Sequence, residues 1–266
     1  MIMETNNTFS LQRFKLLFKQ SYRINKKSVG ISLAAIAGTM FIFLILSQSS
    51  SQFKNWNQAQ GLAIFKVFFF LLGIFYTSFA FPAFRSKEKT MAYLMLPVST
   101  YEKFIFEILI RLVAFILFIP LLFWVVANLE GIIVHYFVPD LINYKFSFYD
   151  AFTKFAQNNS LRGWSVFAYI QTVLFVFIAA FTGASHFSKL PLMKTLFVFS
   201  VIQVGFVLFA YLLYKGLNLK EVNFSIERLL FIKNKAQGII FYEISAMIIN
   251  ISLLTISWFS LKEKEA

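Results

Sequence analysis

The chain has 266 residues, of which 59% are hydrophobic, 20% are aromatic and only 14% are charged. About a quarter of the residues in a soluble domain are charged, so the composition excludes an ordinary soluble globule. The absence of cysteine excludes disulfides, thiolate metal sites and a cysteine nucleophile. The formal net charge is +13, and the basic residues flank apolar segments, which indicates membrane orientation and no nucleic-acid partner.

The 25 basic and 12 acidic residues leave six charge-free windows of 18 residues or longer. A helix needs about 20 mostly apolar residues to cross a bilayer. The windows are apolar on every side, unlike the alternating strands of a membrane barrel. The sequence therefore predicts an all-α polytopic membrane protein in which an amphipathic interfacial helix precedes six transmembrane helices. One domain, 29–260, holds spans at about 29–47, 62–83, 104–128, 164–186, 195–214 and 239–260.

Residues 8–27 are predicted to form an amphipathic helix. At 100° per residue, five apolar side chains fall on one arc, namely Leu11, Phe14, Leu17, Phe18 and Tyr22. Six basic side chains fill the opposite side: Arg13, Lys15, Lys19, Arg23, Lys26 and Lys27. Such a helix lies along a membrane surface with its cations among anionic lipid headgroups. Residues 1–28 are therefore predicted to be a cytoplasmic, elbow-like helix; packing on a partner protein is the alternative.

The distribution of basic residues favours cytoplasmic termini. With the amino terminus inside, the inner segments hold 14 Lys or Arg and the outer segments hold 9. The six basic residues before the first span carry most weight, because the first helix usually dominates orientation. The five basic residues between 215 and 238 oppose this bias. Residues 261–266 are then a cytoplasmic tail, and the aromatic-rich segment 130–163 lies on the outer interface.

The motifs of common enzymes are absent from the sequence. No G-x-x-x-x-G-K-[S/T] phosphate loop occurs, so the chain is not expected to hydrolyse ATP by itself. No H-E-x-x-H or G-x-S-x-G motif occurs, and His135 and His186 are assigned to opposite membrane sides. The sequence predicts no enzyme activity, no catalytic residue, no metal site and no cofactor.

A few polar residues fall in or beside the predicted spans. Glu107 and Arg111 are spaced for an intrahelical ion pair, which either neutralises itself near the headgroups or contacts a substrate. Lys66, early in the second span, can extend toward the membrane surface. The others are expected to face the bundle, where they either join helices or line a pathway. They are Gln171 in the fourth span, Gln203 in the fifth, and Glu243, Asn250 and Ser257 at seven-residue spacing in the sixth.

The connection between the second and third spans contains the most informative stretch, Arg85 to Phe104. Residues 90–96 are predicted to form a short amphipathic helix that Pro97 ends. Ser99 or Thr100 is predicted to cap the third span, with Glu102 in its first turn. The physical interpretation is a short helix held at the cytoplasmic surface between two spans.

Tyr93-Leu-Met-Leu-Pro-Val-Ser-Thr-Tyr-Glu-Lys103 resembles a segment of the ABC-type-2 permeases, the membrane subunits of bacterial ATP-binding-cassette exporters. In that family a stretch of the form L-x-x-L-P-[V/I]-S, followed by Glu and Lys, opens the third span. The basic amphipathic helix and the six-span plan are also similar. The resemblance implies a bacterial cytoplasmic membrane location, a separate ABC ATPase subunit, and a homodimer or a heterodimer with a related permease. The last outer connection departs from many relatives, because 217–232 is only weakly apolar and holds charges.

The expected function is therefore movement of a substrate across the cytoplasmic membrane, driven by the separate ATPase. The ATPase is expected to dock on the short helix, through Met91, Leu94, Met95, Leu96 and Pro97. The alternative is that these side chains rest on the bilayer or on the first helix. Two other functions stay open: a non-transporting scaffold or assembly protein, and an ATP-independent secondary transporter. The sequence leaves the substrate and the direction of transport undetermined.

Overall fold

The structure is a computed structural model that describes residues 9–50, 57–137, 145–157, 163–216 and 235–265. Within these ranges it contains helices and no strands. Six helical stretches are long and apolar enough to cross a membrane, namely Leu11–Ser49, Gln58–Ser78, Thr100–Phe137, Val166–His186, Pro191–Phe209 and Gln237–Lys264. The chain is an all-α polytopic membrane protein, as the charge-free windows predicted.

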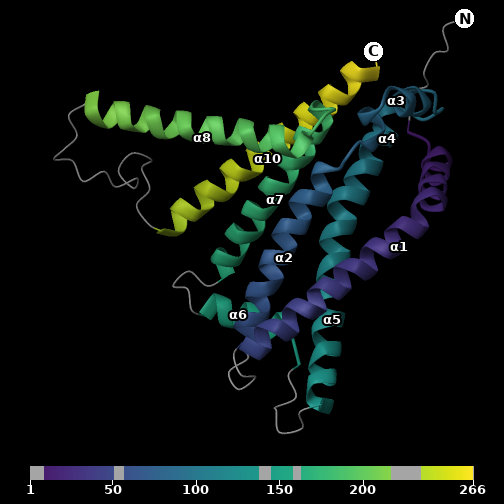
Figure 1. Cartoon of the computed structure of the whole chain (residues 1–266). Helices are drawn as coiled ribbons and strands as arrows, with labels where there is room; N and C mark the ends of the chain where they lie inside the picture. Colours follow the sequence, from purple (N-terminus) through teal and green to yellow (C-terminus); the bar gives the residue numbers. More distant parts are fainter. Residues whose placement is uncertain (1–8, 51–56, 138–144, 158–162, 217–234, 266) are drawn as a thin grey trace, which may run out of the picture.

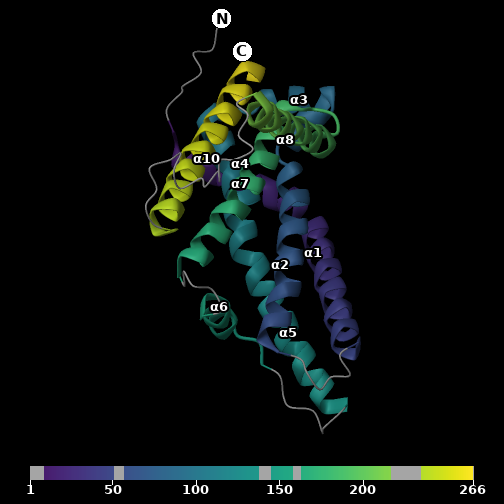
Figure 2. The same cartoon turned by 90° about the vertical axis from the view of Figure 1, so that its left-hand side faces the viewer.

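The helices form an elongated bundle (Figures 1 and 2). The long helices are α1 (Leu11–Ser50), α2 (Gln58–Ser78), α5 (Phe115–Phe137), α7 (Gly163–His186), α8 (Pro191–Gly216) and α10 (Lys235–Glu265). The short elements are the 3-10 helix η1 (Pro82–Arg85), α3 (Lys87–Leu94), α4 (Thr100–Ile108), the π-helical η2 (Leu109–Ala114) and α6 (Phe148–Gln157). The terminal end is the end where α1 begins and α10 ends; the far end is the one where α5 ends (Figure 1).

Helices α7 and α10 form the most extensive helix pair and run in the same direction. Thr182 donates to the carbonyl of Leu253, and Ser260 donates to the carbonyl of Ser185 nearer the terminal end. The apolar core lies between α7, α2 and α5, with Phe123, Phe177 and Phe181 fully buried. The largest helix–helix interface of the bundle is therefore formed by two parallel helices that are joined by hydrogen bonds from side chains to backbone carbonyls.

Helix α1 is continuous over 40 residues, so the predicted boundary at residue 28 lies inside it. The sequence around Ser28, Val29 and Gly30 offers no proline to break the helix, and hydrogen bonding continues through it. The helix changes direction in its amino-terminal third (Figure 1). The amphipathic segment and the first span are therefore two parts of one helix.

The third span begins at the predicted cap. The side chain of Ser99 accepts from the backbone N–H of Glu102, and the Glu102 carboxylate accepts from the backbone N–H of Ser99. This reciprocal capping box satisfies two otherwise unpaired donors of the first turn. Segments α4, η2 and α5 then continue as one helical stretch to Phe137, passing Pro120. The predicted 90–96 helix also exists, as α3, beginning and ending slightly earlier.

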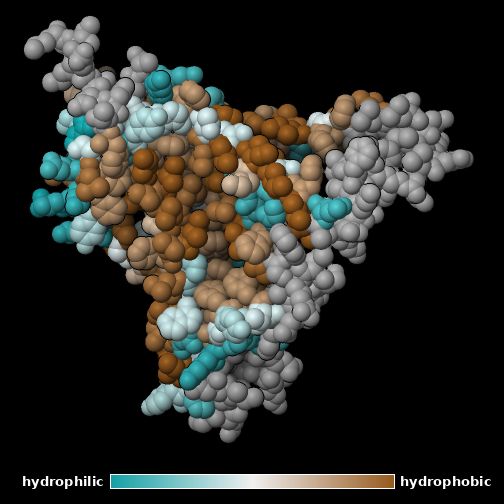
Figure 3. Space-filling model, turned by 180° about the vertical axis from the view of Figure 1, so that it is seen from behind, coloured by the Kyte–Doolittle hydropathy of each residue, from teal (hydrophilic) through white to brown (hydrophobic). Residues whose placement is uncertain are grey.

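Helix α8 leaves the other helices and projects sideways from the terminal end (Figure 1). It is held near its start, where Thr195 is buried against Gly183 of α7 and the rings of Phe175 and Phe199 lie 5.9 Å apart. Large apolar side chains along the rest of α8 are exposed. Seen from behind, apolar side chains cover much of the middle of the molecule; polar groups gather mostly toward its ends, and one polar patch lies near the middle (Figure 3). This banding is expected of a surface that faces lipid.

Candidate functional site

The connection between α2 and α4 is a folded unit at the terminal end. Phe81 adopts φ 51° and turns the chain out of α2. Arg85 donates to the carbonyl of Ser78 at 3.2 Å, and its guanidinium lies 4.4 Å from the ring centroid of Phe79. This cation lies at the carboxyl end of α2, where the helix dipole favours positive charge. Thr90 donates to the carbonyls of Ala83 and Ser86, which ties α3 to η1.

Glu102 joins this connection to the start of α1. Its carboxylate is fully buried and accepts from the backbone N–H of Ser10. The guanidinium of Arg13 lies 3.3 Å from the same carboxylate oxygen. A buried carboxylate requires such donors, because burial without them is costly. The sequence predicted Glu102 as part of the cap, but not as the group that holds the amino-terminal helix.

Aromatic and cationic side chains hold the same connection to α4 and α10. The ring centroids of Phe84 and Tyr93 lie 5.5 Å apart, and a lysine ammonium lies over each ring. Lys264 of α10 lies 5.0 Å from the Phe84 centroid, and Lys103 of α4 lies 4.9 Å from the Tyr93 centroid. Such cation–π contacts become stronger when they are desolvated. The connection is thus held to α4, which follows it in the chain, and to α10, the last helix.

The predicted docking residues differ in exposure. Met91 and Met95 are 61% and 83% exposed, Pro97 is exposed and Leu96 is half-buried. Leu94 ends α3, and its side chain lies outside the described part of the structure. Beside Met91 is a cleft of about 350 Å³ between η1, α3 and the α7–α8 turn. Six of its eight lining residues have polar or basic side chains; the lining consists of Phe84, Arg85, Ser86, Lys87, Thr90, Met91, Ser188 and Lys189.

Glu107 and Arg111 form the predicted intrahelical ion pair, with 3.4 Å between their nearest atoms. Glu107 is buried and Arg111 is half-buried, and the Arg111 guanidinium lies 4.9 Å from the ring centroid of Tyr76 on α2. The backbone N–H of Phe81 also donates to Glu107. Through these contacts the pair links the third span to the end of α2.

The polar residues of α10 and α7 largely follow the prediction. Asn250 and Ser257 are buried, and Glu243 and Gln171 are half-buried. Among the described residues, one oxygen each of Glu243, Asn250 and Ser257 is buried without a hydrogen-bond partner. Gln203 contradicts the expectation that it faces the bundle, since it is exposed on α8. The reason is that α8 packs on the bundle only near its start, which sequence polarity does not reveal.

A second buried carboxylate lies in the far half of the bundle and was not predicted as a site residue. Glu130 of α5 is fully buried and accepts from the side-chain amide of Gln48 of α1 at 2.7 Å. Its other carboxylate oxygen has no hydrogen-bond partner among the described residues. Glu130 ends one charge-free window, which is the only sequence signal for it.

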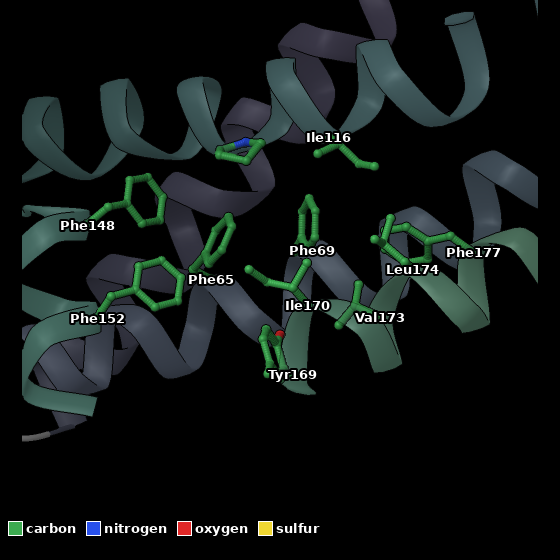
Figure 4. Close-up of a pocket in the computed structure, with 11 residues that line it drawn as sticks. Phe65, Phe69, Ile116, Phe148, Phe152, Tyr169, Ile170, Val173, Leu174 and Phe177 are labelled. Carbon is green, nitrogen blue, oxygen red and sulfur yellow. The ribbon is translucent and has the colours of Figure 1, made fainter. Parts of the chain in front are cut away.

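An aromatic pocket of about 250 Å³ lies between α2, α5, α6 and α7 (Figure 4). It is lined by Phe65, Phe69, Ile116, Pro120, Phe148, Phe152, Tyr169, Ile170, Val173, Leu174 and Phe177. Phe148 and Phe152 come from the aromatic-rich segment that was predicted to lie on the outer interface. Figure 4 shows the rings of Phe65, Phe69 and Phe152 bordering the same space. The sequence does not reveal this pocket, because its lining comes from four separate elements.

Across the described ranges, no group of three or more His, Asp or Glu side chains is arranged to hold a metal ion. No protein-family model, curated protein or solved structure matches this chain.

Proposed function

We propose that the chain is the permease subunit of an ATP-binding-cassette exporter of the bacterial cytoplasmic membrane, with both termini inside. The proposal is based on the surface of the unit formed by η1, α3 and the start of α4. The unit exposes Met91 and Met95 beside a cleft lined by three basic residues, at the end of the bundle where the described chain begins and ends. Exposed methionines suit a docking surface because their side chains adapt to a partner.

The contacts of this unit support a role in transmitting motion. Glu102 binds the start of α1, and the capping box makes the unit continuous with the third span. The ring of Tyr101 lies 4.2 Å from that of Trp258 on α10, and Phe104 also contacts Trp258. A displacement of α3 by an ATPase would therefore be transmitted to α1, α4 and α10 through these contacts. Coupling of this kind requires contiguous packed contacts, which are present here.

The proposed pathway and partner follow from two further features. The stripe of Glu243, Asn250 and Ser257 brings polar atoms into an apolar interior, where polar groups commonly mark a substrate path. The exposed α8 gives the membrane domain a large surface for a second copy or a related permease. Two such chains would enclose a path that one chain leaves open at its side.

Copurification tests the docking surface. Substitution of Met91 and Met95 by Asp is expected to abolish copurification with the proposed ABC ATPase subunit, while membrane insertion is unchanged. The matched control replaces Tyr136 and Tyr149, which are 80% and 78% exposed in the far half, by Asp. Equal ATPase recovery from both double variants would refute docking at α3. Flux through the purified chain without any ATPase would instead indicate a secondary transporter.

A further inference from the structure

The aromatic pocket is suited to an apolar occupant. Its volume of about 250 Å³ exceeds the roughly 150 Å³ apolar cavity that accommodates benzene. Five phenylalanines and several aliphatic side chains line it, and Tyr169 contributes the one side-chain hydroxyl of the lining. A water molecule in a cavity needs two to four polar partners, which these side chains do not supply. A hydrocarbon chain satisfies the lining without any hydrogen bond.

The pocket reaches the side of the bundle. Ile170 of α7 belongs to the lining and is 45% exposed, whereas Val173, one turn further along, is buried. Phe148 and Phe152 of α6 close the pocket toward the far end (Figure 4). Among the described residues, the pocket is therefore open at the apolar side of α7, where Ile170 lies.

A cation lies at the edge of the same pocket. Lys66 is flanked in sequence by the lining residues Phe65 and Phe69, and its ammonium lies 5.0 Å from the ring centroid of Tyr169. It is eight residues into α2, which corresponds to about 12 Å along the helix from Gln58. A charge at this depth is costly in a bilayer and commonly has a functional role. Its flexible stem allows the ammonium to approach the membrane surface.

We infer that this pocket binds the acyl chain of an anionic amphiphile and that Lys66 holds its acidic head. The aromatic lining is suited to the acyl chain of the ligand, and the Lys66 ammonium is suited to its negatively charged head. Either a membrane lipid or a free fatty acid carries this chemistry. Binding of this amphiphile requires only the pocket and Lys66 of this chain and does not require the proposed ATPase partner.

Photolabelling of the purified full-length chain tests the inference. The chain is placed in phosphatidylcholine nanodiscs and exposed to a diazirine-bearing palmitate or to the corresponding alcohol. Wild-type protein is expected to bind the acid at least roughly tenfold more tightly than the alcohol, with label on α2 and α7 peptides. Lys66→Gln is expected to remove this preference while leaving the alcohol affinity unchanged. Lys194→Gln, which removes another lysine that lies over an aromatic ring, is the matched control.

Two further experiments test whether the pocket is the binding site and which ligand occupies it. Ile170→Trp is expected to block labelling by both probes, whereas Val201→Trp, on the equally exposed surface of α8, is expected to have no effect. Competition by phosphatidylglycerol alone identifies a membrane lipid, and competition by unlabelled palmitate alone identifies a free fatty acid. The inference is overturned if acid and alcohol label wild-type protein equally, or if Ile170→Trp labels like Val201→Trp.

Discussion

Glu102 is the residue whose substitution is expected to release the amino-terminal helix. Glu102→Gln keeps an oxygen for the capping box but removes the charge that faces Arg13. The loss of a hydrogen bond to a charged group costs about 1.5–3 kcal/mol, so α1 should detach locally. Faster tryptic cleavage after Arg13 or Lys15 measures this release. The control is Glu88→Gln, an exposed acid in the first turn of α3, and equal cleavage of both variants would contradict the role of Glu102.

Gly73 is expected to tolerate no side chain. A Cβ atom built there overlaps the ring of Phe177, which is fully buried. Gly73→Ala should therefore destabilise the protein by about 1–3 kcal/mol, the usual cost of overpacking. Gly205→Ala is the matched control, because a Cβ there meets nothing within 4 Å. Thermal unfolding in detergent compares the two, and equal midpoints would show that α2 and α7 can separate at no cost.

The residues that sequence analysis located are those whose partners lie nearby in the chain. The Ser99–Glu102 cap and the Glu107–Arg111 pair involve positions three and four residues apart, so spacing alone predicts them. The contact of Glu102 with Ser10 joins residues 92 apart, and that of Gln48 with Glu130 joins residues 82 apart. Such pairs depend on how the helices pack, which one sequence does not encode locally.

At the level of elements, α1 gives the clearest prediction. Leu17 is 7% exposed, while Lys15, Lys19 and Arg23 are exposed. Cysteines at the three basic positions should react with a water-soluble thiol reagent in membranes, and a cysteine at Leu17 should be protected. The predicted arc also contained Phe18, which packs on Phe106 but remains 46% exposed. Protection at all four positions would place this segment against another protein.

Helix positions were easier to predict than helix contacts. Each charge-free window overlaps one long helix, because burial in lipid demands an uninterrupted apolar stretch. The prediction of two separate segments missed that the amphipathic segment and the first span form one helix, although no proline separates them. The windows also contained no sign that α8 projects sideways, because its apolar surface satisfies lipid and protein equally well.

For the whole molecule, the arrangement predicts an even number of crossings. The Lys264 contact with Phe84 and the Ser10 contact with Glu102 place the two ends of the described chain at one end of the bundle. With the proposed cytoplasmic termini, reporter fusions after Ser50, Phe84, Phe137, His186, Gly216 and Ala266 should alternate, beginning outside. An inside signal after Gly216 would mean that α8 lies along the inner surface, and it would contradict six spans.

The pairing of α7 with α10 has a consequence for synthesis. Thr182 and Ser185 of α7 meet partners that lie 71 and 75 residues further along the chain. The ribosome delivers α7 to the membrane well before it makes α10, so until then the side of α7 that carries Thr182 and Ser185 lacks its partner helix. Pairing is complete only when the last helix has entered the bilayer. Assembly of the bundle is thus expected to finish only when α10 has been made. A nascent chain that stalls after Gly216 would leave the α10-binding surface of α7 exposed, and membrane quality control could recognise the stalled chain by that surface.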